Sequence, residues 1–133
     1  METKQVLVIR KDLNMRKGKI ASQAAHASMA VFTNMMQPNI EGGNRTIRHF
    51  TVPTDGFINH WLNNSFTKIC VSVDSEEELM EVYNKAKEKE IPCSLIEDNG
   101  TTEFGGVKTK TCVAIGPWDV TMINEITGHL KLL

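Results

Sequence analysis

The stretch that decides how this chain folds is Val6-Leu7-Val8-Ile9, followed by Met15-Arg16-Lys17-Gly18-Lys19-Ile20-Ala21-Ser22-Gln23-Ala24-Ala25-His26-Ala27. The apolar run predicts a strand, and the longer run predicts a helix over residues 16–36. In a helix, Lys19, Gln23 and His26 lie at positions i, i+4 and i+7, on one face. A stripe of small alanines lies beside them. The helix therefore presents a cation, an amide and an imidazole to a partner that approaches closely.

Strand and helix patterns alternate along the rest of the chain. We expect strands at 5–10, 68–73, 93–96, 111–115 and, at the end, 129–133. We expect helices at 16–36, 55–63 (burying Phe57, Ile58, Trp61 and Leu62), from Asp74 or Ser75 to before Pro92, and at 118–127. Residues 37–53, with Pro38, Gly42, Gly43 and Pro53, and residues 98–110 should be irregular. This order predicts a single α/β domain over residues 1–133, with a mixed four- to five-stranded sheet sandwiched between helices in three layers.

The composition is typical of a soluble domain. The 133 residues are 41% apolar and 23% charged, which is enough to bury a core. No apolar run approaches the roughly 20 residues that span a membrane, and we see no signal peptide. Three cysteines lie in apolar, strand-like runs without metal-binding spacing, so we expect reduced thiols, no metal and a cytoplasmic protein: Cys70, Cys93 and Cys112.

The net charge of −1 conceals two segments of opposite sign. Residues 1–20 carry six cations against two acids, a net charge of +4. Residues 74–90 carry seven acids against three lysines, a net charge of −4. A face that binds a polyanion would explain the basic end, and Arg16 and Lys17 belong to it. Two solvated faces would give the same pattern.

Lys19 and Asp98 form the first candidate catalytic pair. Lys19 lies in the first helical turn, at the positive end of the helix dipole, where a cation needs a carboxylate or phosphate partner. Asp98 follows the predicted strand 93–96, so both residues lie where a strand has just ended, and the two loops can open on the same edge of the sheet. With Thr102 they would suit hydrolysis, because a carboxylate can orient water and a cation can stabilise developing charge. Because Asn99 and Gly100 follow it, Asp98 could instead cap a turn.

The loop from Phe104 to Lys110 is a second candidate. Its glycines, Gly105 and Gly106, permit close backbone approach, and Lys108 and Lys110 could contact phosphates. A mobile surface hairpin is the alternative.

Several segments carry a resemblance to a known family, in order along nearly the whole chain: Val6-Leu7-Val8-Ile9-Arg10-x-Asp12-Leu13-x-Met15-x-x-Gly18-Lys19-x-Ala21-x-Gln23-x-x-His26-Ala27, Ile96-x-Asp98-x-Gly100-x-Thr102-Glu103, Thr111, Ala114-Ile115-Gly116-Pro117 and Ile126-Thr127-Gly128-His129-Leu130-Lys131-Leu132-Leu133. Together they resemble the type 2 peptidyl-tRNA hydrolases, the archaeal and eukaryotic class. Two segments depart from the family pattern. Residues 99–106 carry a longer loop with Phe104-Gly105-Gly106 in place of an apolar-Pro-Gly turn, and residues 34–56 are longer than expected.

The resemblance implies a peptidyl-tRNA hydrolase, a carboxylic ester hydrolase that frees tRNA from peptides left by stalled translation. It implies Lys19, Asp98 and Thr102 as catalytic residues and a homodimer, with no metal or organic cofactor. We favour Asp98 as water orienter or base, Lys19 as electrostatic stabiliser and Thr102 as positioner, with Thr102 as nucleophile left open. Substrate-binding or supporting roles are expected for Gln23, His26, Arg16, Lys17, Gly100, Lys108 and Lys110, with tRNA as partner. The altered loop 99–106 would favour the alternative, a non-catalytic module that binds tRNA or a protein.

Overall fold

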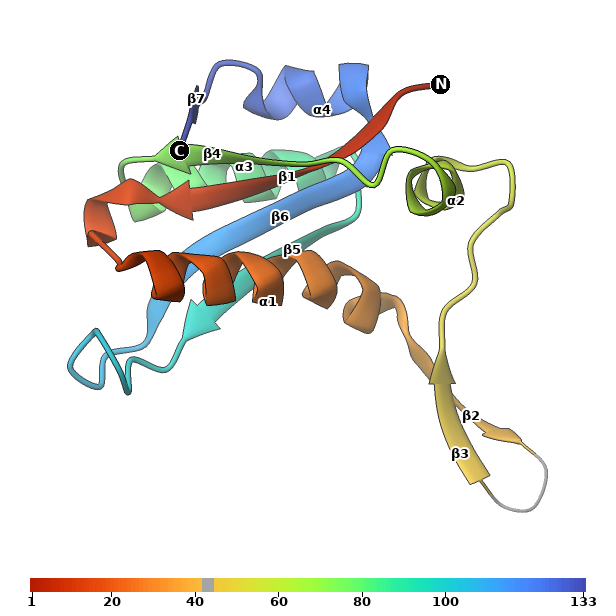
Figure 1. Cartoon of the computed structure of the whole chain (residues 1–133), viewed down its shortest axis with the longest axis horizontal. Coiled ribbons are helices and arrows are strands. Elements are labelled where there is room, and N and C mark those ends of the chain that lie inside the picture. Colours follow the sequence, from red (N-terminus) through yellow and green to blue (C-terminus); the bar gives the residue numbers. More distant parts are fainter. Residues whose placement is uncertain (42–44) are drawn as a thin grey trace.

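Strand β1 (Thr3–Arg10) is the central strand of a five-stranded sheet (Figure 1). The structure is a computed structural model that describes residues 1–41 and 45–133. The strand order is β5-β6-β1-β4-β7. Strand β1 runs parallel to β4 and antiparallel to β6, and β5 and β7 are antiparallel to their neighbours. The carboxyl ends of β1, β4 and β5 therefore share one edge. The bounds of the other four strands are β4 Lys68–Val73, β5 Cys93–Asp98, β6 Thr109–Asp119 and β7 Lys131–Leu132.

Helices cover both faces of this sheet. Helices α1 (Lys17–Met35) and α2 (Phe57–Asn63) lie on one face, and α3 (Glu76–Glu88) and α4 (Val120–Thr127) lie on the other. Because successive side chains of a strand point to opposite faces, β1 supplies both cores. Leu7 and Ile9 pack toward α1 and α2, whereas Val6 and Val8 pack toward α3 and α4. The predicted fold class, a mixed sheet between two helical layers, is confirmed.

The segment predicted to be irregular over 37–53 contains a β-hairpin instead. Strands β2 (Gln37–Glu41) and β3 (Arg45–His49) pair antiparallel with each other and not with the main sheet. Figure 1 shows this hairpin projecting beyond the carboxyl end of α1. The prediction was wrong because it read Pro38 as a breaker, whereas proline is tolerated at a sheet edge, and both strands of a two-stranded ribbon are edges. Gly42 and Gly43 lie outside the described residues.

Other boundaries differ in smaller ways. Strand β6 continues through Gly116 and Pro117 to Asp119, so the last helix begins at Val120 and not at 118. Asp119 caps this helix by accepting a hydrogen bond from the Met122 backbone N–H at 3.1 Å. Leu62 was expected to be buried but is 38% exposed. The closing strand is limited to Lys131 and Leu132.

Among the described helices, none has the length and apolar character that crossing a bilayer requires.

Candidate active site

The turn between β1 and α1 sets the position of the first helical turn. After β1 the chain makes a 3₁₀ turn over Lys11–Leu13, and Asn14 then adopts a left-handed conformation with φ 52°. Arg10 braces this turn, since its guanidinium binds both carboxylate oxygens of Asp12, at 2.6 and 3.1 Å. The same guanidinium donates to the Lys110 carbonyl at 3.0 Å, which ties the turn to the start of β6. The start of α1 is thereby fixed against the sheet edge.

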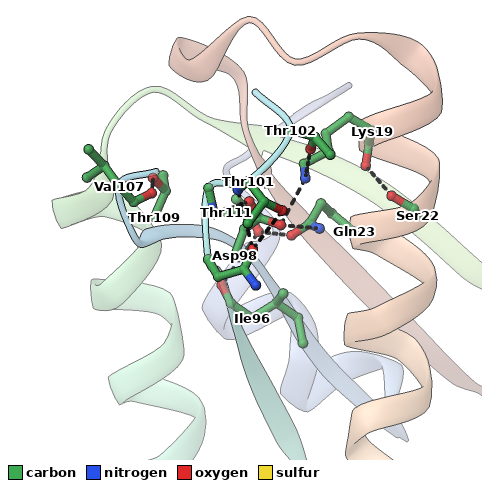
Figure 2. A network of polar contacts seen from close by, with 12 residues as sticks. Lys19, Ser22, Gln23, Ile96, Asp98, Thr101, Thr102, Val107, Thr109 and Thr111 are labelled. Atoms are coloured by element: carbon green, nitrogen blue, oxygen red, sulfur yellow. Dashed lines mark hydrogen bonds and ion pairs between the residues drawn. The ribbon is translucent and has the colours of Figure 1, made fainter. Parts of the chain in front are cut away.

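Lys19, Asp98 and Thr102 meet at this edge (Figure 2). The Lys19 Nζ donates to Asp98 Oδ1 at 2.8 Å and to Thr102 Oγ1 at 2.9 Å. Lys19 and Asp98 are 79 residues apart in the sequence, and their side chains are only 13% and 12% exposed. Their meeting follows from the sheet, because β1 and β5 run in the same direction and end at the same edge. The expectation that these three side chains converge is confirmed.

The Asp98 carboxylate is held by three donors. Oδ1 accepts from Lys19 and, at 3.3 Å, from Gln23 Nε2, and Oδ2 accepts from the Gly100 backbone N–H at 2.8 Å. The hydrogen bond from Lys19 is the main cause that lowers the pKa of Asp98. Partial burial opposes this effect, while Gly100, the charge of Lys19 and Gln23 add to it. Asp98 is therefore a carboxylate at neutral pH.

Gln23 is oriented by Thr111, a residue for which no role was predicted. The Thr111 hydroxyl, fully buried in β6, donates to Gln23 Oε1, so the amide nitrogen of Gln23 faces Asp98 (Figure 2). Gln23 itself is only 2% exposed. A lone hydroxyl beside the apolar run Cys112-Val113-Ala114-Ile115 was the available signal, because a buried polar group needs a partner.

Gly100 acts through its backbone. Its φ is +81°, and a Cβ at this position would collide with the Val107 backbone. The loop can therefore close over Gly100 and direct its N–H at Asp98. A role in contacting substrate stays a prediction.

The remaining predicted residues lie outside the cluster. The His26 side chain is exposed on α1 and makes no hydrogen bond within residues 1–41 and 45–133, unlike the side chains of Lys19 and Gln23 on the same helix. Arg16, Lys17 and Lys108 are exposed, and Lys110 is half-buried at the start of β6. Their roles in binding substrate stay predictions.

A cleft of about 400 Å³ adjoins Thr102. Its walls also include Leu13, Asn14, Arg16, Glu103 and Phe104. The described part of the chain holds no group of three or more His, Cys, Asp or Glu side chains arranged to bind a metal ion. The arrangement as a whole offers an ionised carboxylate, an ammonium group and a hydroxyl beside an open cleft, which suits attack by water on an ester.

Comparison with known proteins points to one family. The family model described as "Peptidyl-tRNA hydrolase PTH2" matches residues 3–133. A peptidyl-tRNA hydrolase of Methanocaldococcus jannaschii is 40% identical over 130 residues, covering 98% of this chain and 99% of the relative. One from Sulfurisphaera tokodaii is 38% identical over the full length of both chains. A probable peptidyl-tRNA hydrolase 2 of Drosophila melanogaster is 36% identical over 98% of this chain and 61% of its own length.

A solved structure of a protein of unknown function from Agrobacterium tumefaciens has a similar fold. It superimposes with a TM-score of 0.55 over 100% of this chain and 98% of its own, at 14% identity. This likeness concerns the fold alone.

Proposed function

The chain belongs to the PTH2 family of peptidyl-tRNA hydrolases, and we propose that it hydrolyses the ester between peptide and tRNA at Lys19, Asp98 and Thr102. This reaction recycles tRNA from stalled translation. The observation that carries the proposal is the Lys19 ammonium, which bridges the Asp98 carboxylate and the Thr102 hydroxyl at 2.8 and 2.9 Å. Each of these groups keeps a hydrogen-bond donor or acceptor that no neighbour among the described residues occupies, and that position suggests its role in the reaction.

Lys19 stabilises negative charge. An ammonium group has three N–H donors, and two of them are directed at Asp98 and Thr102. The third is available to the carbonyl oxygen of the ester, which gains negative charge when water attacks. Because Lys19 is only 13% exposed, this interaction is weakly screened by solvent.

Asp98 orients the attacking water. Each carboxylate oxygen can accept two hydrogen bonds, and Oδ2 accepts only from Gly100 among the described residues. A water molecule bound to its free position points its oxygen away from the carboxylate. That oxygen forms the new bond to the ester carbon, the bond from this carbon to the ribose oxygen breaks, and a proton of the water ends on the ribose. The lowered pKa of Asp98 makes it a weak base and favours orientation over proton removal.

Thr102 positions the substrate or the water. Its oxygen accepts from Lys19, so its own O–H is free to donate. Accepting a hydrogen bond from a cation withdraws electron density from the oxygen, which disfavours the nucleophile role. The alternative of a non-catalytic module loses support because the altered loop 99–106 still directs Thr102 at Lys19.

The test is Asp98→Asn, with Glu97→Gln on the same strand as matched control. We expect kcat on peptidyl-tRNA to fall about 10²–10⁴-fold, the typical value of a positioned acid–base group, with melting temperature and tRNA affinity close to the parent. Glu97 is exposed, so its variant should retain parental kcat. Parental turnover by a folded Asp98→Asn protein would make Asp98 a turn residue. A parent protein that binds tRNA without turnover would favour the binding module.

We infer that the substrate tRNA is held by exposed and half-buried cations around the same edge. Arg16 and Lys17 flank the start of α1, Arg16 lines the cleft beside Thr102, and Lys108 and Lys110 border the loop that carries Thr102. Phosphate contacts of this kind supply most of the nonspecific affinity for nucleic acid.

A cytoplasmic location is also proposed. The cysteines are free thiols, and burial raises the pKa of Cys112 to about 12, so that thiol stays protonated and unreactive. Thiols of this kind suit a reducing compartment.

We propose that the protein is a homodimer whose contact is an apolar groove beside α1. The groove has a volume of about 550 Å³ and combines Phe32 and Trp61 with two strongly exposed side chains, Met29 at 55% and Phe66 at 54%. Exposed apolar surface of this kind marks an interaction site. We expect light scattering to give about twice the 14.9 kDa of one chain for the parent protein and one chain for Met29→Glu. Val107→Glu, at an apolar residue elsewhere that is 64% exposed, should leave the mass unchanged. A monomeric parent would contradict the proposal.

A further inference from the structure

We propose that the cleft beside Thr102 binds the 3′-terminal nucleotide of the tRNA, with its base stacked on Phe104. This inference rests on the proposed function, because it concerns the same site, and it assigns a place to one defined part of the substrate. The cleft is lined by Leu13, Asn14, Arg16, Thr102, Glu103 and Phe104.

The position of the cleft follows from the ester. Peptidyl-tRNA joins the peptide to the ribose of its last nucleotide, so the base of that nucleotide lies one sugar away from the reacting carbon. Thr102 belongs both to the catalytic cluster and to the wall of the cleft. A group bound in the cleft is therefore adjacent to Lys19 and Asp98, as the terminal base must be when its ester is in place.

The chemistry of the walls suits a nucleobase. Unpaired bases are recognised by stacking on aromatic rings or guanidinium planes and by hydrogen bonds to their edges. The cleft offers the ring of Phe104 and the guanidinium of Arg16 for stacking. Asn14 donates one hydrogen bond to the Asp12 carbonyl at 3.3 Å, which leaves its side-chain oxygen free to accept, and Glu103 supplies a second acceptor.

Phe104 is held in place before any ligand arrives. Its ring is half-buried against the core that lies under α1, and the Lys19 Nζ is 5.7 Å from the ring centroid, within the range of a cation–π contact. A ring that is already ordered loses little conformational entropy when a base stacks on it, so little of the stacking free energy is offset and the affinity is higher.

The base fits this cleft better than the peptide does. The side chains of a nascent peptide differ from one substrate to the next, whereas every tRNA ends in the same single-stranded CCA sequence. A wall that combines an aromatic ring, a cation, an amide and a carboxylate at fixed positions matches an invariant partner. The apolar groove beside α1 shares none of the cleft's lining residues.

The experiment measures binding of the trinucleotide CCA to the whole chain by NMR titration and calorimetry. Phe104→Leu keeps an apolar side chain against the core but removes the flat ring. We expect it to weaken CCA binding roughly 5- to 150-fold, the range that loss of base–aromatic stacking gives. Phe104→Trp should restore affinity. The control is Phe57→Leu, an aromatic residue of α2 that packs on Trp118, with ring centroids 4.8 Å apart, and it should bind CCA like the parent.

A second probe identifies the base as the partner of the ring. A CCA analogue whose last nucleotide lacks its base should bind the parent protein at least as weakly as CCA binds Phe104→Leu, because it also loses the hydrogen bonds to the base edge. Combining the analogue with Phe104→Leu should cost no more than the analogue alone, because the stacking contact is already absent. Equal CCA affinity of parent and Phe104→Leu, or losses that simply add, would overturn the inference.

The outcomes separate this inference from the proposed function. CCA binding needs no turnover, so a parent protein without hydrolase activity whose CCA affinity depends on Phe104 would contradict the proposed function alone. Full hydrolase activity with CCA affinity independent of Phe104 would overturn the inference alone.

Discussion

At the scale of single residues, Asp98 couples the site to the stability of the fold. Its charge is stabilised by Lys19 and by the Gly100 N–H, and partial burial opposes that charge. The balance leaves its pKa below the ordinary 3.8. The native state therefore binds the proton of this group less tightly than the unfolded state does.

This balance predicts how Asp98 contributes to stability across pH. With a lowered folded pKa, the contribution is complete above about pH 4, where the group is also ionised in the unfolded chain, and is lost as pH falls through the folded pKa. The difference in free energy of unfolding between the parent and Asp98→Asn should be constant from about pH 7 to pH 5 and shrink below about pH 4. Denaturant titrations at several pH values measure it. A difference that stays constant down to pH 3 would mean that the pKa is not lowered.

Single residues also show which contacts of the candidate site could be predicted from the sequence. Lys19 and Asp98 could be paired in advance, because each follows a strand and the carboxyl ends of co-directed strands meet at one edge. The sequence indicated that the Thr111 hydroxyl needs a partner, but which partner could not be predicted. Its contact with Gln23 depends on how α1 packs across β6, and no local sequence pattern sets that packing.

At the scale of elements, helix α3 shows local signals agreeing with the fold. The sequence placed its start at Asp74 or Ser75, and Ser75 is the cap, accepting from the Glu78 N–H at 3.1 Å. The Glu78 carboxylate in turn accepts a hydrogen bond from the backbone N–H of Asp74 at 3.2 Å. Both signals act within a few residues, which is why they could be recognised. The β2–β3 hairpin could not be recognised, because its pairing is a cross-strand property and a proline such as Pro38 is equally common in loops.

The cap gives a prediction for stability without a change in activity. Ser75→Ala removes the acceptor of one helix N-terminal N–H and should lower the free energy of unfolding by about 1 kcal/mol. Ser75→Asp should retain most of the parental free energy of unfolding, since an Asp side chain also caps helices. Denaturant melts measure the difference, and kcat should be parental in both because α3 lies on the face of the sheet opposite α1. Equal stability of Ser75→Ala and the parent would show that the cap contributes nothing.

At the scale of the whole molecule, charge is distributed unevenly between the basic amino-terminal segment and the acidic helix α3. Helix α3 lies on the face of the sheet opposite α1, and the two charged regions meet where Arg10, at the end of β1, lies 3.9 Å from Glu76, at the start of α3. Away from this contact, the basic segment gives one edge of the molecule a positive field toward an approaching polyanion.

Salt dependence checks this field. The logarithm of tRNA affinity should fall linearly with the logarithm of salt concentration, with a slope of about −0.9 for each duplex phosphate neutralised. Replacing Arg16 and Lys17 by Ala should flatten the slope and weaken binding to all tRNAs alike. The matched control replaces Lys85 and Lys87 of α3, removing the same charge from the opposite layer, and should leave the slope unchanged. An unaltered slope in the Arg16/Lys17 variant would assign those cations to a solvated face.

The pairing of β1 with β6 also determines when the active site first exists. The central strand β1 is synthesised about a hundred residues before its antiparallel partner β6, with Val6 opposite Ile115. Contacts this distant along the chain form slowly, because a long loop must close before any contact is gained. The contact between Lys19 and Asp98 can therefore form only after β5 and β6 have been synthesised and have paired with the sheet. A copy whose own synthesis stalls between Thr102 and the start of β6 contains Lys19, Asp98 and Thr102 but lacks the strand that brings them together, so the proposed enzyme cannot act from such an unfinished chain.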